Sequence, residues 1–538
     1  MKQQSYIKNA AILTATGLFL RGAGMLFRIY IAGRIGAEGM GLYQLVLTVY
    51  NLAVTVSTAG LTVCATRIAT DAFAKNSDTQ SAMARVIRLG IMLGSFCALV
   101  LFLSAEIVSR YSIRDMRAVL ALKVLAPSLP FMAISACLRG YFISRRSVVP
   151  NAKAQIFEQF VRITFVAVLI DIAVPIGISV ACAAVTAGNT VSEICSWVYM
   201  WHSYRKDCKG EGCIVNKGEG FVGSKSVGDI GSKGKGGIGS KVEGGIGGNG
   251  GISIAHILVP IAANQYVSAF LRTFENIIIP SCLTAFTHSR ETSLAQFGAL
   301  KGMAMPVIFF PFSFLLTLST LLLPEITDAF IRKQSKAMEH LISRVMLITC
   351  VLSVAMGGVF AMFAKEIGLL LYKSEEIGFY IAVLGPLAPF MYIESMVDSI
   401  LKGMDEQLST FKYSMFDCIS RIILIYILVP RFGMAGFLFV MIYSNLLTGI
   451  LNIRRLFCVT KIRFNWLAWV IKPILSIALS VAAIHFVLMP LLMLFLPLWG
   501  YAVAGAISLL CLFFILLWLM GGFSIKDLLP KKVNATSL

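Results

Sequence analysis

Long runs of apolar residues recur from one end of the chain to the other, separated by short breaks rich in charge, proline or glycine. A helix of about 20 apolar residues spans the hydrocarbon core of a bilayer. The runs are too continuous for the alternating strands of a membrane barrel, and they satisfy their own backbone groups only as helices. We therefore predict an all-α polytopic membrane protein with about 14 transmembrane helices. The predicted spans are 10–33, 43–70, 86–108, 118–143, 154–174, 176–202, 254–286, 296–327, 340–364, 378–401, 410–429, 432–453, 466–489 and 494–520.

The composition excludes a water-soluble enzyme. Hydrophobic residues make up 57% of the 538 positions, charged residues 14%, and the mean hydropathy is +0.81. An ordinary soluble domain has roughly 25% charged residues. The sequence contains no metalloprotease helix, nucleophile elbow or phosphate loop. We expect no catalytic residues, no cofactor and no bound metal.

The formal net charge of +20 would suggest a nucleic-acid partner in a soluble protein. Here many of the basic residues flank apolar runs, where they orient a membrane protein. Alternate loops on the side of the N-terminus hold about twice as many Lys and Arg as the loops on the other side. We therefore expect a multi-pass protein of the cell membrane with both termini in the cytoplasm, and no nucleic acid.

The segment 206–252 differs from the rest of the chain because 17 of its 47 residues are glycine. Gly-Ser-Lys recurs in it with a period of eight. Such a composition predicts a disordered cytoplasmic linker. It divides the chain into residues 1–205, a first six-helix half, and 253–456, a second six-helix half, followed by two additional transmembrane helices and a short cytoplasmic tail in 457–538.

The two halves repeat each other in sequence. Phe-Leu-Arg at 19–21 recurs at 270–272, and the Pro-x-x-Pro-Phe-Met-x-Ile motif at 127–134 recurs at 386–393. Arg162-Ile163 recurs as Arg421-Ile422. Six spans in each half place both halves in the same orientation, so the repeat is parallel. Two such halves that rock against each other predict a transporter with alternating access.

Several arginines fall inside predicted spans, where charged groups usually face a cavity or a partner. Arg21 and Arg28 lie two helical turns apart on one face, and Arg272 begins the matching helix of the second half. These three predict a cationic, substrate-binding cavity, since guanidinium groups bind phosphate bidentately. The alternative for Arg272 is an ion pair with Glu275.

Other charges inside the spans admit two interpretations. Glu158 and Arg162 are four residues apart on one helix, and we favour an ion pair for them. Glu394 and Asp398 have the same spacing and predict a site for Na⁺ or H⁺ as coupling ion. The alternative is that Lys402, one turn further on, neutralises them.

The runs 21–28 (Arg-Gly-Ala-Gly-Met-Leu-Phe-Arg) and 36–44 (Gly-Ala-Glu-Gly-Met-Gly-Leu-Tyr-Gln) resemble the opening of the stage V sporulation protein B group. This group is part of the polysaccharide-transport branch of the multidrug/oligosaccharidyl-lipid/polysaccharide exporter superfamily. Residues 302–306, 310–311 and 323–326 resemble the eighth helix of that family.

The resemblance implies a flippase for a polyprenyl-diphosphate-linked saccharide, such as a peptidoglycan precursor of the lipid II type, with a place in spore cortex synthesis. Its partners would be that lipid-linked anionic saccharide and the membrane lipid. In related flippases, arginines of the first and seventh helices line the central cavity, and Arg21 and Arg272 hold the corresponding positions. Arg28 is displaced by one residue from the spacing in those flippases.

Two other functions are compatible with the sequence. One is a multidrug or organic-cation exporter of the same superfamily, driven by Na⁺ or H⁺ through Glu394 and Asp398. The other is a non-transporting membrane scaffold for cell-wall enzymes that uses 206–252 as its contact region.

Overall fold

The computed structural model describes residues 2–74, 78–145, 147–211, 250–460, 466–495 and 497–522. Within these residues the regular elements are helices, and no strand is present, which confirms the predicted all-α membrane fold. Nine helices of this part of the chain are long and apolar enough to cross a membrane, or up to ten if one bent pair counts as a span. The count of about 14 stays a prediction.

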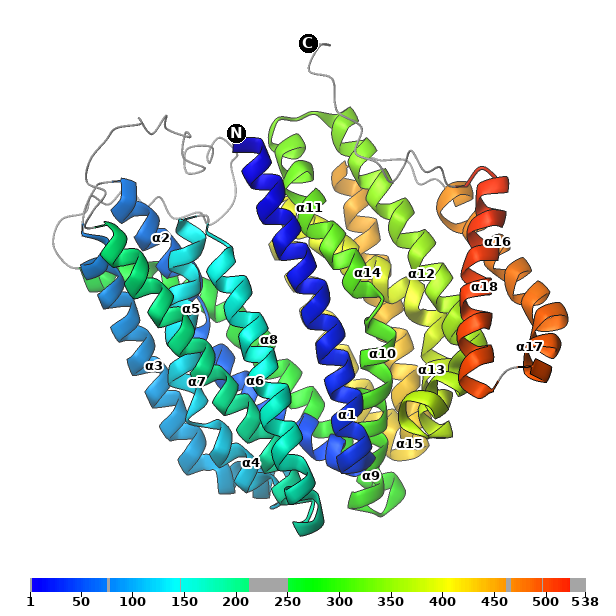
Figure 1. Ribbon diagram of the computed structural model, residues 1–538, viewed down its shortest axis with the longest axis horizontal. Coiled ribbons are helices and arrows are strands. Elements are labelled where there is room, and N and C mark those ends of the chain that lie inside the picture. The colour runs from blue at the N-terminus through cyan, green and yellow to red at the C-terminus, as the bar shows by residue number, and fades with distance from the viewer. Residues whose placement is uncertain are drawn as a thin grey trace.

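The helices before residue 212 form one group. Figure 1 shows α1 on the side of this group that borders the rest of the molecule. Their bounds are α1 (Lys2–Thr58), α2 (Leu61–Ala74), α3 (Thr79–Ile107), α4 (Ala118–Leu125), α5 (Ser128–Ser144), α6 (Val149–Ala173) and α7 (Ile178–Glu211), with a π-helical turn at Val108–Ile113 and a 3₁₀ turn at Val174–Ile176.

The second group follows from residue 250. It contains α8 (Gly250–Thr287), α9 (Arg290–Phe297), the π-helical turn η3 (Gly298–Ala304), α10 (Met305–Phe309), α11 (Phe312–Ile331), α12 (Ser335–Tyr372), α13 (Glu375–Leu384), a 3₁₀ turn at Gly385–Leu387, α14 (Ala388–Gly403) and α15 (Gln407–Thr460). The last elements are a π-helical turn at Leu467–Ile471, α16 (Lys472–Ala483), a π-helical turn at Ile484–Leu488, α17 (Met489–Phe495) and α18 (Leu498–Leu519). Both α16 and α18 pack on α12, at the outer edge of the second group (Figure 1).

The chain changes direction at equivalent places in the two groups. Left-handed backbone conformations occur at Gly36, Arg114 and Gly177, and again at His288, Lys373 and Gly433. Each residue of the second set lies between 252 and 259 residues after its counterpart, the range of the sequence repeat. Such residues end one helix and let the next begin in a new direction. These six breaks in the backbone therefore follow the same repeat as the sequence motifs.

The edges of the predicted linker differ from the expectation. Helix α7 continues to Glu211, and α8 already begins at Gly250, so 206–211 and 250–252 are helical. Glycine lowers helix propensity but does not forbid a helix that continues from a packed segment. The remainder of the predicted linker, 212–249, lies outside the described residues.

Candidate functional site

The two groups of helices meet most closely where α1 crosses α9 and η3. A Cβ atom added at Gly41 would lie 2.0 Å from the Leu294 carbonyl oxygen, and one added at Gly298 would lie 2.0 Å from the Ala37 carbonyl oxygen. Only glycine permits this approach of two backbones. The contact lies at the end of the molecule opposite the start of α1, as Figure 1 shows for α9.

Charged residues reinforce the same end. The Arg290 guanidinium of α9 donates a hydrogen bond to the Ile113 carbonyl of the first group. Nearby, Arg117 forms ion pairs with Asp115 and Glu38, at 2.8 and 2.7 Å. The hydrogen bond to Asp115 raises the pKa of Arg117 above its ordinary value, against the opposing effect of burial, and the bond to Glu38 acts in the same direction. Arg117 therefore remains a fixed positive charge at this contact.

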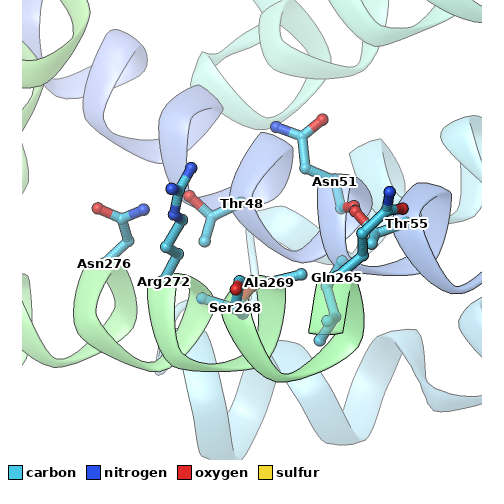
Figure 2. A pocket seen from close by; sticks show the side chains of 10 residues that line it. Thr48, Asn51, Thr55, Gln265, Ser268, Ala269, Arg272 and Asn276 are labelled. Carbon is cyan, nitrogen blue, oxygen red and sulfur yellow. The ribbon is translucent and has the colours of Figure 1, made fainter. Parts of the chain in front are cut away.

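A cavity of about 510 Å³ lies between α1 and α8, away from that contact. Hydroxyl and amide groups of both helices line it, and Arg272 contributes the charged side chain. Figure 2 shows Arg272 extending from α8 towards α1, beside Thr48. At the Thr55 and Gln265 end, Tyr266 of α8 donates a hydrogen bond to the Val56 carbonyl of α1, at 3.2 Å. The lining residues are Thr48, Asn51, Leu52, Thr55, Gln265, Ser268, Ala269, Arg272, Thr273 and Asn276.

The Arg272 guanidinium has no hydrogen bond or ion pair with another residue in the described part of the chain. Glu275, which the sequence offers as its partner, pairs instead with Arg421 of α15, at 3.0 Å. The described contacts thus leave the Arg272 donors directed into a polar cavity. An unpaired guanidinium in such a place attracts an anion.

A second cavity of about 300 Å³ adjoins the first, and Arg272 lines both. Its wall holds an ion-paired cluster: Arg421 contacts Glu275 and also Asp417, at 3.4 Å, and donates to Ser444 Oγ, at 3.3 Å. Lys301, from the π-helical turn η3, lines the same cavity. This second cavity carries charges of both signs, unlike the first.

The two acids predicted as a coupling site have different surroundings. Asp398 forms an ion pair with Lys402 at 2.6 Å, which is the alternative that the sequence left open. Glu394 lines the second cavity and accepts a hydrogen bond from Asn452 Nδ2, at 3.2 Å. Of the two carboxyl groups, Glu394 is therefore the one placed at a cavity without a cationic partner among the described residues.

The predicted arginine cluster is distributed over more than one place. Arg21 of α1 donates a hydrogen bond to the Ser313 carbonyl of α11, at 3.2 Å. Arg28 lies further along α1, where its charge acts on Tyr372 of α12. Neither lines the two cavities at Arg272. Their convergence on one substrate stays a prediction.

In the first group, Arg162 Nη2 lies 2.5 Å from Glu158 Oε1, which is the ion pair favoured by their spacing. The charged residues that were not among the predicted site residues are Asp417, Lys301 and Glu193 of α7. Asp417 stands four residues before Arg421, as Glu158 does before Arg162, so the same spacing search would have found it. The positions of Lys301 and Glu193 depend on which helices pack together, and no local signal reveals them.

Comparisons with known proteins agree with this architecture. The profile of the family described as polysaccharide biosynthesis protein matches residues 6–221. Stage V sporulation protein B of Bacillus subtilis (strain 168) is 26% identical over 466 residues, which cover 84% of this chain and 83% of that protein. The resemblance seen in the sequence motifs is thereby confirmed.

Solved structures show the same fold. The lipid II flippase MurJ in an inward closed conformation aligns with a TM-score of 0.66 and 12% identity, over 95% of this chain and 98% of that one. A multidrug resistance MATE family transporter of the MOP superfamily, in an inward-facing conformation, aligns with a TM-score of 0.62 and 13% identity, over 84% of this chain and 99% of that one. At such identities the likeness establishes the fold.

Proposed function

We propose, from the premise that this membrane protein is related to the polysaccharide biosynthesis proteins and has the MOP transporter fold, that it is a flippase for a polyprenyl-diphosphate-linked saccharide. The substrate class that we favour is a peptidoglycan precursor of the lipid II type, used in spore cortex synthesis. The observation that carries the proposal is the Arg272 guanidinium, unpaired among the described residues, in a polar cavity between α1 and α8.

The chemistry of this cavity suits a diphosphate attached to a sugar. Arg272 would donate two parallel hydrogen bonds to phosphate oxygens. The amide and hydroxyl groups of Asn51, Thr55, Gln265 and Asn276 are the groups that bind sugar hydroxyls and amides. In the same proposal, Arg21 and Arg28 extend the positive potential along α1 and guide the anionic head group.

Two unequal contacts between the halves support a mechanism of alternating access. In this conformation the halves are joined through backbone at Gly41 and Gly298, and through the Tyr266 side chain at the other end of the cavity. We infer that the transport cycle separates the glycine contact and closes the end at Thr55 and Gln265. With both termini in the cytoplasm, the glycine contact would face the outside.

The decisive experiment is translocation of lipid II in cells depleted of other flippases, with a neutral-headed polyprenyl lipid and an organic cation as comparison substrates. Wild type should move lipid II, and Arg272→Ala should lose that transport while its membrane abundance stays normal. Arg332→Ala is the matched control, because Arg332 is an exposed arginine at the end of α11, paired with Asp328. Equal transport by wild type and Arg272→Ala would overturn the proposal.

The second candidate is a cation-coupled exporter of organic cations. Glu394 at the second cavity favours it, since a carboxylate at a cavity attracts cations. Transport of the organic cation alone, lost in Glu394→Gln, would decide for this function. The scaffold alternative depends on 206–252, most of which lies outside the described residues.

A further inference from the structure

A second group of charged residues lies inside the first half, away from the cavities at Arg272. Besides its ion pair with Glu158, Arg162 of α6 donates a hydrogen bond from Nε to Ser192 Oγ of α7, at 3.4 Å. The next residue on α7 is Glu193, and its carboxyl group lies close to that of Glu158. Two carboxyl groups therefore meet beside one guanidinium.

Burial and unused polar atoms distinguish this site. Glu193 is 7% exposed and Gln159 is 8% exposed. Glu193 Oε2 and Gln159 Nε2 have no hydrogen-bond partner among the described residues. Gln159 belongs to the same cluster, because its Oε1 accepts a hydrogen bond from Arg162 Nη1, at 3.5 Å. Unpaired polar atoms this deeply buried are uncommon and call for an explanation.

The equivalent place in the second half lacks the carboxyl pair. There Arg421 pairs with Asp417, four residues before it, and donates to Ser444, as Arg162 does to Ser192. The residue after Ser444 is Asn445, an amide where the first half has a carboxylic acid. Glu193 is therefore a specific feature of the first half and is not required to hold the arginine.

Two ionised carboxylates that lie close together repel each other. One of the two carboxyl groups therefore holds a proton. Glu158 is ion-paired with Arg162, whereas Glu193 is more deeply buried and has no ion pair among the described residues, which assigns the proton to Glu193. The other titratable or charged groups that act on Glu193 or this cluster are Arg139 of α5 and Tyr50 of α1. We propose that Glu193, with Glu158, is a proton-binding site that couples the first half to proton movement across the membrane.

Helix α1 connects this site to the substrate cavity. The charges of the cluster act on Tyr50, which shares a 2.5 Å hydrogen bond with Ser128 of α5. Thr48 and Asn51, on the same helix as Tyr50, line the cavity. Movement of this segment of α1 during transport would change the surroundings of Glu193. The proton then leaves or joins the Glu193 carboxyl group, and no other reactant is needed. This role as coupling site rests on the proposed transport function.

The test begins with a measurement that is independent of substrate. Infrared absorption of protonated carboxyl groups is followed while the pH is raised, on purified full-length protein in lipid nanodiscs. The wild type should show a carboxylic acid signal that Glu193→Gln lacks. The control Glu375→Gln, at an exposed acid paired with Lys365, should retain this signal. Glu158→Gln should also lose it, because Glu193 no longer has a carboxylate with which to share the proton. An undiminished signal in Glu193→Gln overturns the proposal.

The second readout is lipid II translocation in proteoliposomes with and without an imposed proton gradient. The gradient should change the wild-type rate and leave the rate of Glu193→Gln unchanged, while Glu375→Gln responds like wild type. A wild-type gradient response in Glu193→Gln overturns the coupling site. If the wild type moves no lipid II but Glu193→Gln still loses the carboxyl signal, the proposed flippase function fails and the proton site stands.

Discussion

Glu275 of α8 and Arg421 of α15 form an ion pair of 3.0 Å that joins the first and last long helices of the second half. Glu275 is almost completely buried, with 6% of its side chain exposed. The pair satisfies a carboxylate that the spacing along α8 had offered to Arg272. The two arginines therefore have different roles. Arg421 forms ion pairs with Glu275 and Asp417, whereas the Arg272 guanidinium remains available to bind a ligand.

We expect Arg421→Ala to lower the thermal stability of the purified protein, whereas Arg272→Ala leaves it near that of the wild type. Removal of one partner from a buried ion pair costs about 3–5 kcal/mol, because the remaining charge is left unpaired. Thermal unfolding followed by fluorescence-detected size exclusion measures the difference. Glu275→Gln combined with Arg421→Gln should lose less stability than the two single losses added.

Equal stability of Arg421→Ala and wild type would contradict this division of roles. A strong destabilisation by Arg272→Ala would contradict it as well, since it would place Arg272 in the supporting structure of the second half.

The glycine contact predicts which small substitutions block transport. At Gly298 an added Cβ would lie 2.0 Å from the Ala37 carbonyl oxygen. A backbone atom cannot move away by a change of rotamer. At Gly302, four residues on, the nearest atom is the flexible end of Met40, at 3.1 Å. We expect Gly298→Ala to disfavour the closed contact by about 1–3 kcal/mol and Gly302→Ala to be tolerated.

The measurement is the distance between spin labels at Asn51 and Gln265, on the two walls of the cavity. Gly298→Ala should shift the population towards the conformation in which these walls are closer, and Gly302→Ala should retain the wild-type distribution. An unchanged distribution in Gly298→Ala would show that the glycine contact does not govern the conformational equilibrium.

Bidentate recognition at Arg272 predicts the outcome of a conservative change. Lysine keeps the positive charge but offers a point charge in place of a planar pair of donors. A lost hydrogen bond to a charged group costs about 1.5–3 kcal/mol, which is about tenfold or more in affinity. Arg272→Lys should therefore raise the lipid II concentration at half-maximal transport by about that factor. Full wild-type affinity in Arg272→Lys would exclude bidentate binding.

Much of the fold is predictable from the sequence because the length of an apolar run is a local property. The repeat also located Arg272, since its counterpart Arg21 stands in the same three-residue motif. The partners of Glu275 and Glu193 were not predictable, because each is supplied by another helix. The ends of α7 and α8 were misplaced for a related reason: both helices extend into glycine-containing sequence that composition alone assigns to a linker.

The final prediction concerns the glycine-rich segment between α7 and α8. The described residues that form the cavity, its arginine and the contacts between the halves lie outside 212–249. A flippase therefore needs this segment only to join two halves, and a Gly-Ser chain of equal length serves the same purpose. Replacement of 212–249 by such a chain should leave lipid II translocation and membrane abundance within about twofold of wild type, which for a ratio of rates corresponds to less than 0.5 kcal/mol.

The matched control shortens the replacement until it no longer spans from Glu211 to Gly250, which should abolish transport by constraining the two halves. Loss of function with the full-length replacement, at normal abundance, would instead show that the native segment recruits a partner. That result would favour the scaffold over the flippase, because the described residues that line the cavity at Arg272 lie outside the replaced segment.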